Sequence, residues 1–496
     1  MIEAWVSGFT SVFEPSALLL LLIGTGIGYA IGFIPGLAGA FALAMLIPFA
    51  ISMESAHAVV FLLAAHAVVM TGGSLSAILF NAPGTGANVP ASWDGYPMTR
   101  MGQGGRAIAA AATASAIGGV VSGFVLMGLI PVVRAILLAF GPPEFFMLSV
   151  MAYSFVASVT GRYPFKALAA VFFGLLLSTI GTDPALAIPR FTFGTFYLWE
   201  GVDLIPLVMG LFAVSEMIKL AVSKKGIVSG SVQIGRDVFQ GVKETFQKWF
   251  LVLRCSGIAS VIGIIPGLGA ELATFMCYGH ALQSSKTPEK FGKGAIEGVI
   301  GAEAGNNGKE GGSLLTTLAF GVPGSSSMAI LLGFFITMGI IPSPEMLKEH
   351  LPLIFSMAWV IIIANVLGAC ISIFAGRYMA KISAIRAPLL VSVLLVVTVI
   401  GGAASNNNLG DIGTTFLFGF IGYQMDKFGY SKAAFIVGFV LGKITEKNLF
   451  ISIQIYQGAG FLLRPLTIIL AIIAIAAFAW PIISQKRKNN KEPHEK

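Results

Sequence analysis

An apolar segment interrupted by proline and glycine occurs twice in this chain. Residues 32–39 read Gly-Phe-Ile-Pro-Gly-Leu-Ala-Gly, and residues 263–269 read Gly-Ile-Ile-Pro-Gly-Leu-Gly. Each copy is followed by a second matched segment that begins Gly-Gly-Ser-Leu and ends in Pro-Gly and a hydroxyl residue, at 72–85 and 311–325. Because proline removes a backbone donor and glycine tolerates unusual backbone angles, each break is expected to unwind a helix. Paired breaks in two halves of a hydrophobic chain indicate a transporter whose site lies where the interrupted helices meet.

The chain carries too little charge to cover a soluble surface. Of its 496 residues, 56% are hydrophobic and 11% are charged, whereas soluble domains have about 25% charged residues. A membrane-spanning helix needs about 20 predominantly apolar residues. We therefore expect an all-α polytopic membrane protein with about 10–12 transmembrane helices, the final number depending on the broken segments. The clear spans are 106–133, 144–160, 165–182, 203–222, 352–376, 388–404 and 464–483.

The broken segments are shorter apolar runs, which are typical of half-spanning or re-entrant helices. Irregular backbone at membrane depth is tolerated only where it is buried in protein or lines a wet cavity. The predicted pairs are 17–34 with 37–51, 57–80 with the Pro83-Gly84 turn, 255–265 with 268–283, and 294–320 with the Pro323-Gly324 turn and 326–342.

The charge pattern divides the chain. We predict an N-terminal membrane repeat at 16–222, a linker at 223–252 with a surface helix near 233–250, a C-terminal repeat at 253–483 and a basic tail at 484–496. Most of the net charge of +8 lies in the linker and the tail, and such an excess of Lys and Arg marks cytoplasmic segments rather than nucleic-acid binding. The N-terminus, which has no lysine or arginine before Leu18, is expected outside.

The two Pro-Gly turns are the candidate substrate site. Backbone N–H groups at the start of a half-helix, with neighbouring hydroxyl groups, suit an anion, and the helix dipole supports the binding. The predicted substrate contacts are Asn81, Pro83, Gly84, Thr85 and Asn88 at the first turn, and Pro323, Gly324, Ser325, Ser326 and Ser327 at the second.

A polar stretch precedes the second turn. Asn306 and Asn307 are expected to contact the substrate, and Lys309 either neutralises an anion or pairs with Glu310. Exposed carbonyl groups at the other half-helix ends suit a hard cation such as sodium. The candidate sodium ligands are Gly36, Gly39, Ser74, Gly267, Gly269 and Ser313.

Other functional classes find less support in the sequence. There is no P-loop, GxSxG or HExxH motif, so we expect no enzyme, no ATP hydrolysis by this chain and no organic cofactor. A passive anion channel or a membrane scaffold subunit remains the alternative. A channel usually has one selectivity segment per subunit, and a scaffold does not need matched polar turns.

A set of short motifs follows one order along nearly the whole chain. In the first half they are Pro35-Gly36-Leu37, Gly72-Gly73-Ser74, Asn81-Ala82-Pro83-Gly84-Thr85, Asp94-Gly95-Tyr96-Pro97-Met98, Gly141-Pro142-Pro143-Glu144 and Pro189-Arg190-Phe191-Thr192-Phe193-Gly194. In the second half they are Pro266-Gly267, 291–299, Asn306-Asn307, Gly311-Gly312 and Val322-Pro323-Gly324-Ser325. The chain thereby resembles the large membrane subunit of the tripartite tricarboxylate transporters, bacterial systems of TctA type.

That resemblance implies more than the residues alone. It implies a multi-pass protein of the bacterial inner membrane with two partners, a small four-helix membrane subunit and a periplasmic solute-binding protein. It implies uptake of a di- or tricarboxylate such as citrate, driven by sodium ions or protons. The implied fold has two inverted repeats and a mobile domain with two hairpins that moves like an elevator.

Three places differ from the usual family pattern, and all lie near the predicted site. They are Gly86-Ala87-Asn88 with Trp93 nearby, Glu271, and the stretch around the paired asparagines that contains Lys309 and Glu310. These differences favour a carboxylate other than citrate.

Overall fold

The computed structural model describes residues 1–37, 39–137, 139–159, 164–183, 188–222, 237–265, 269–342, 346–382, 395–399 and 408–489. Its first half contains α1 (Ile2–Val12), α2 (Pro15–Phe33), α3 (Ala40–Ala50), α4 (Ser55–Phe80), η1 (Gly86–Asn88), α5 (Val89–Arg100), α6 (Gly104–Leu137), α7 (Pro142–Val159), α8 (Pro164–Ser178), β1 (Gly181–Thr182), β2 (Pro189–Arg190), η2 (Phe196–Leu198), α9 (Leu204–Val208), η3 (Met209–Val214) and α10 (Ser215–Val222).

The second half is also helical. It contains α11 (Val238–Gln247), α12 (Trp249–Ile264), α13 (Gly269–Ser284), η4 (Pro288–Lys290), α14 (Ile296–Gly308), α15 (Glu310–Phe320), α16 (Ser326–Thr337), α17 (Met346–Glu349), α18 (Leu351–Ile382), α20 (Leu409–Phe428), α21 (Lys432–Ile455), η5 (Ala459–Leu463) and α22 (Pro465–Asn489).

The labels η1, η2, η4 and η5 mark short 3₁₀ helices, and η3 marks a π-helix. Apolar helices dominate this architecture. Among the described residues, five helices are long and apolar enough to cross a membrane, and several shorter apolar helices lie beside them. The strands in the described part of the chain form one short antiparallel pair, β1 and β2. The predicted all-α polytopic membrane fold is confirmed. The predicted span 388–404 lies mostly outside the described residues.

Helix α4 is the centre of the fold, and its most apolar stretch is wholly buried. Helix α2 packs against it through Gly24, Gly28 and Gly32. A methyl group at any of the three would lie within 2.4 Å of a carbonyl oxygen of α4. Small residues spaced by four bring helix backbones together in a membrane, and this spacing sets the position of α2.

The same backbone contact occurs again in the second half. A methyl group on Gly72 of α4 would meet the Tyr29 oxygen at 2.5 Å and the Phe33 nitrogen at 2.9 Å. A methyl group on Gly312 of α15 would meet the Ser260 oxygen at 2.3 Å and the Ile264 nitrogen at 3.0 Å. Helices α2 and α4 are thus packed as α12 and α15 are, which gives the duplicated sequence a structural counterpart.

This packing corrects the pairing that the repeated Gly-Gly-Ser motif suggests. Gly72 corresponds to Gly312 rather than to Gly311, because these two glycines make the same contact with the preceding helix. The second segment accordingly has one more residue between its first glycine and its Pro-Gly turn. Ser74 and Ser313, both candidate cation ligands, are therefore not equivalent positions.

The predicted helix breaks are present. Helix α2 ends at Phe33 before α3 begins at Ala40, and α12 ends at Ile264 before α13 begins at Gly269. Both helices before the Pro-Gly turns end in a left-handed residue, Asn81 after α4 and Gly321 after α15. One break was not predicted: the segment 294–320 is divided between α14 and α15.

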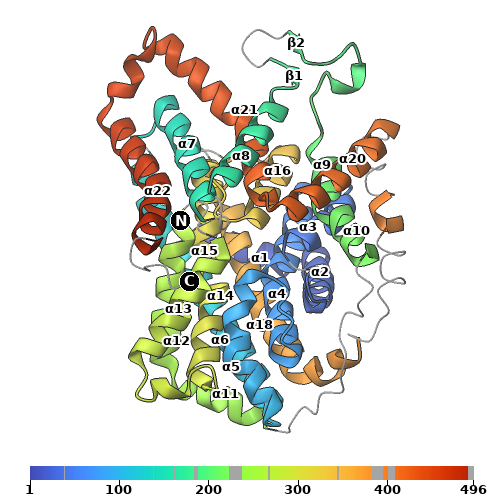
Figure 1. Ribbon diagram of the computed structural model, residues 1–496, viewed down its shortest axis with the longest axis vertical. Coiled ribbons are helices and arrows are strands. Elements are labelled where there is room, and N and C mark those ends of the chain that lie inside the picture. Colours follow the sequence, from blue (N-terminus) through green and yellow to red (C-terminus); the bar gives the residue numbers. More distant parts are fainter. Residues whose placement is uncertain are drawn as a thin grey trace.

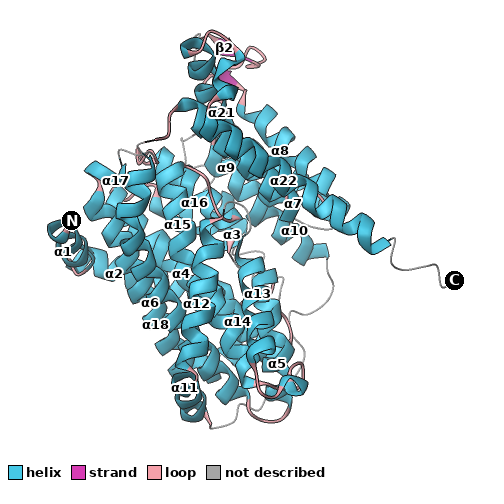
Figure 2. Cartoon of the chain, turned by 90° about the vertical axis from the view of Figure 1, so that its left-hand side faces the viewer, coloured by secondary structure: helices cyan, strands magenta, loops and turns pink. Residues whose placement is uncertain are grey.

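The predicted linker contains a surface helix, but it is shorter than expected. Helix α11 covers Val238–Gln247, and α12 begins at Trp249, inside the range assigned to the linker. Arg106 at the start of α6 forms a bidentate salt bridge with Glu244 of α11, in which two guanidinium nitrogens donate to the two carboxylate oxygens at 2.7 and 2.8 Å. Figure 1 shows α11 at the opposite end of the molecule from β1 and β2, and Figure 2 shows α22 projecting away from the other helices.

Candidate functional site

Three segments that are far apart in the sequence meet at Gly39. A methyl group placed on Gly39 would lie 3.3 Å from the Ser327 hydroxyl oxygen and 3.8 Å from the Thr85 methyl carbon. Gly39 itself has a positive φ of 63°, a conformation that favours glycine. The first helix break and both Pro-Gly turns, all predicted as site elements, are therefore brought together.

The first turn is organised by its own side chains. Helix α4 ends at Asn81 with φ 53°, and the chain reverses through Pro83 and Gly84. The Asn88 side-chain oxygen then accepts hydrogen bonds from the Thr85 backbone nitrogen at 3.1 Å and its hydroxyl at 3.0 Å. This reciprocal cap fixes the start of η1, which leads into α5.

The second turn has a simpler cap, made by one side chain. The Ser325 hydroxyl accepts a hydrogen bond from the Met328 nitrogen at 3.2 Å at the start of α16. Gly324 packs so closely on Ser313 that a methyl group would lie 2.1 Å from its hydroxyl oxygen. Pro323 and Ser327 are buried, whereas Ser325 and Ser326 are partly exposed.

Three helix starts therefore lie close together: α3 begins at Ala40, η1 and α5 follow Thr85, and α16 begins at Ser326. Each N-terminus has backbone N–H groups without partners in its own helix and a partial positive charge. This arrangement is suited to an anion without needing a lysine or arginine.

A buried polar network lies directly behind the first turn. The Asn88 amide donates to the Ser74 hydroxyl at 2.8 Å, and Ser74 donates to the Glu303 carboxylate at 2.6 Å. Asn306 also reaches Ser74, at 3.2 Å. The structure thus joins the predicted residues Asn88, Ser74 and Asn306, and adds Glu303. The acidic residue three positions before Asn306 was the available sequence signal for it.

The next turn of the same helix is also polar. Asn307 donates to Thr71 at 3.0 Å and to Asn365. Lys309 is 3% exposed and pairs with Glu310, which is the second of its two predicted roles. Glu310 also contacts His66 at 2.8 Å, so sequence reasoning missed His66 as a partner of this pair.

The remaining predicted residues have different outcomes. Gly36 is exposed with φ 80°, and Ser313 is buried beside Gly324. Gly269 is the first residue of α13, and Gly267 lies outside the described residues. Trp93 packs edge-on against Phe275 and Tyr278, two side chains of α13.

Comparison with known proteins identifies the family. Residues 18–437 match the model of the tripartite tricarboxylate transporter TctA family. The chain belongs to this family. An uncharacterised 52.8 kDa protein from the TAR-I ttuC′ 3′ region of Agrobacterium vitis is 30% identical over 495 residues, covering 97% of this chain and 96% of that protein.

A second uncharacterised protein, from the TAR-II ttuC′ 3′ region of the same organism, is 30% identical over 233 residues, which is 46% of this chain and 96% of that protein. No solved structure matches the chain.

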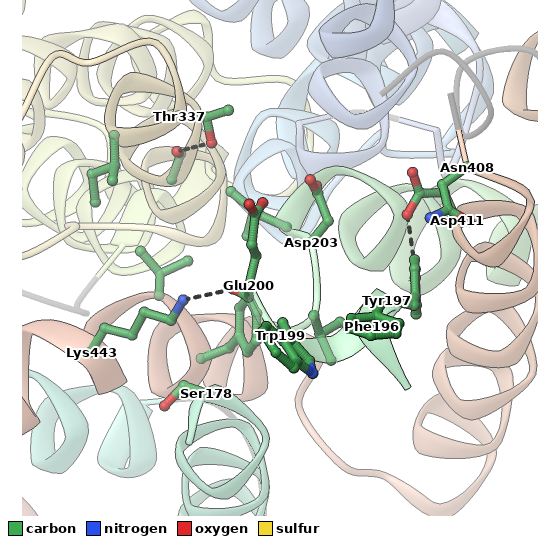
Figure 3. A pocket seen from close by; sticks show the side chains of 17 residues that line it. Ser178, Phe196, Tyr197, Trp199, Glu200, Asp203, Thr337, Asn408, Asp411 and Lys443 are labelled. Atoms are coloured by element: carbon green, nitrogen blue, oxygen red, sulfur yellow. Dashed lines mark hydrogen bonds between the residues drawn. The ribbon is translucent and has the colours of Figure 1, made fainter. Parts of the chain in front are cut away.

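A cavity in this TctA-family protein lies away from the convergence at Gly39. It has a volume of about 640 Å³ and lies between η2, α9, α16, α20 and α21. Figure 3 shows Glu200 and Asp203 between Lys443 on one side and Tyr197 and Asp411 on the other. Burial raises the pKa of Tyr197 to about 12, and its hydroxyl donates to Asp411 at 2.8 Å. Its lining has three acidic residues, Glu200, Asp203 and Asp411, against one basic residue, Lys443, which disfavours a carboxylate. The convergence at Gly39 is therefore the better candidate for a substrate site.

Proposed function

We propose that this chain is the large membrane subunit of a binding-protein-dependent secondary transporter that imports a di- or tricarboxylate. The observation that supports this most is the meeting of the helix break and both Pro-Gly turns at Gly39, in a member of the TctA family. The substrate carboxylates would be held by the N-termini of α3, α5 and α16 and by the hydroxyls of Thr85, Ser325 and Ser327.

The partners follow from the family. A small four-helix membrane subunit and a periplasmic solute-binding protein would complete the system in the bacterial inner membrane. The binding protein would deliver the carboxylate, and a cation gradient of sodium ions or protons would drive its uptake.

The pairing of the duplicated helices supports an inverted repeat. Glu303 lies opposite Ser74, Asn307 opposite Thr71 and Glu310 opposite His66. Residue numbers rise along α14–α15 as they fall along α4, so these helices, each followed by a Pro-Gly turn, run antiparallel. An inverted pair with a shared central site is the arrangement on which alternating access, here by an elevator-like movement, depends.

The test is uptake of labelled carboxylates into proteoliposomes that contain both membrane subunits, with the binding protein outside. We expect saturable uptake that requires the binding protein and an imposed cation gradient. Uptake without the binding protein, proportional to substrate concentration, would instead indicate a passive channel.

Two serines that cap helices in the same way allow an effect on substrate binding to be distinguished from an effect on stability. Ser325 caps α16 through Met328, and Ser431 caps α21 through Ala434. Ser325→Ala and Ser431→Ala should each cost about 1 kcal/mol of stability. We expect only Ser325→Ala to weaken the apparent substrate affinity. Equal transport by the two variants would remove the second turn from the site.

A further inference from the structure

The buried carboxylate of Glu303 has no cationic partner among the described residues. Its side chain is 0% exposed, and it accepts hydrogen bonds there from the Ser74 hydroxyl at 2.6 Å and the Asn306 amide at 3.4 Å. The other buried acid of the polar stretch 303–310, Glu310, pairs with Lys309 and His66. An acid in the membrane interior is costly unless its charge is neutralised, and no described side chain neutralises Glu303, so a bound cation or a proton is the expected partner.

A second feature points to the same place. The Asn306 side-chain oxygen is buried without a hydrogen-bond partner, while its nitrogen reaches Ser74 and Glu303. Buried polar atoms are nearly always paired. An unpaired oxygen beside a carboxylate without a cationic partner is suited to act as a ligand for a bound cation.

There is also space beside the carboxylate. A small cavity of about 10 Å³ is lined by Glu303 and by the hydroxyl residues Thr71, Ser74 and Ser372, with apolar side chains forming the remaining wall. That volume corresponds to about one water-sized sphere. The cavity therefore admits one small ion and excludes an organic cation.

We propose that Glu303, with Ser74, Thr71 and Asn306, forms a binding site for one sodium ion that drives transport. This inference rests on the proposed function and gives its coupling cation a location. All the ligands are oxygen atoms, which hard cations prefer, and the single carboxylate matches one positive charge. A proton would need only the carboxylate, and it would leave the neighbouring cavity empty and the Asn306 oxygen unpaired.

The position of this site explains how ion and substrate would be linked. Ser74 accepts a hydrogen bond from Asn88, and Asn88 holds the Thr85 cap of the first turn. A sodium ion at Glu303 would order Ser74 and, through Asn88, the turn that meets Gly39. Binding of the cation would thus prepare the N-terminus that receives the carboxylate.

The direct test is thermal unfolding of the purified full-length protein in detergent, titrated with sodium chloride against potassium and choline chloride at fixed ionic strength. We expect sodium alone to raise the melting temperature of the wild type in a saturable manner. Glu303→Gln, which keeps the shape and removes the buried charge, should fold and lose this shift. A wild type that does not distinguish sodium from potassium would overturn the proposal.

Matched serines provide a second variant. Ser74 contacts Glu303, whereas Ser76, buried on the same helix, bonds to the Gly73 carbonyl oxygen. Ser74→Ala should weaken the sodium-dependent shift, and Ser76→Ala should leave it unchanged. Equal sodium responses of both variants and the wild type would exclude Ser74 as a ligand.

Transport assays separate this proposal from the proposed function. With an imposed sodium gradient, Glu303→Gln should lose concentrative uptake but retain exchange of internal for external carboxylate. If the wild type transports no carboxylate, the proposed function fails, while the sodium-dependent melting shift is still decisive for the ion site. Uptake driven by a pH gradient alone, with no response to sodium, would overturn the sodium site and leave the transporter proposal intact.

Discussion

The two break-and-turn regions share a backbone design and differ in their charge. Gly72 and Gly312 make the same close contact with the preceding helix, and both turns follow a left-handed residue. At positions that correspond through this packing, α4 has Val69 and Met70 where the second region has Lys309 and Glu310. Close helix packing thus requires small residues in both copies, whereas the charged pair Lys309 and Glu310 is present in the second copy only.

The largest expected effect comes from breaking the charged pair of the second copy. Glu310→Met should destabilise the protein by about 3–5 kcal/mol, because it leaves the Lys309 charge buried without its partner. The double change Lys309→Val with Glu310→Met reproduces the first copy and should cost less than the single change. Thermal unfolding in detergent measures both. A double variant less stable than the single one would show that the charges stabilise the fold by more than their mutual pairing.

The glycine contacts test whether the two copies are structurally equivalent. Gly72→Ala and Gly312→Ala should each cost about 1–3 kcal/mol, because the added methyl groups meet backbone atoms that cannot move aside. Gly26 in α2 and Gly257 in α12 provide controls, because a methyl group added to either would have no atom within 4 Å. Their alanine variants should be unchanged or slightly more stable. Sensitivity at one copy alone, measured by folded yield and melting temperature, would contradict the equivalence.

The residues before the turns should show the smallest effect. Gly321 has φ 65°, and a methyl group there would meet only the end of the Ile444 side chain, at 3.8 Å. Gly321→Ala should therefore cost about 1–2 kcal/mol from backbone strain alone. Gly321→Asn, which copies Asn81, should cost less because asparagine tolerates this conformation. Asn81→Gly should be nearly neutral. Melting temperatures of the three variants provide the measurement, and an equal loss for alanine and asparagine at 321 would argue against a purely backbone effect.

Much of the fold could be predicted because its signals are local. Low charge and long apolar runs specify a helical membrane protein, and the Pro-Gly pairs specify where helices stop, since these effects act on neighbouring residues along the chain. The same turns, with Thr85 and Ser325, were predicted as site elements, and the structure places both turns close to Gly39. The division of α14 from α15 at Lys309 was missed because no proline marks it.

The sequence by itself determined the membrane class, the duplication, the positions of the breaks and the family resemblance. Only the tertiary structure decided how the copies pair: that Gly72 corresponds to Gly312, that His66 meets Glu310 across 244 positions, and that Ser74 joins Asn88 to Glu303. The reason is physical. A hydrogen bond between buried side chains depends on which helix faces meet, and the packing of glycines against neighbouring backbones sets those faces at long range.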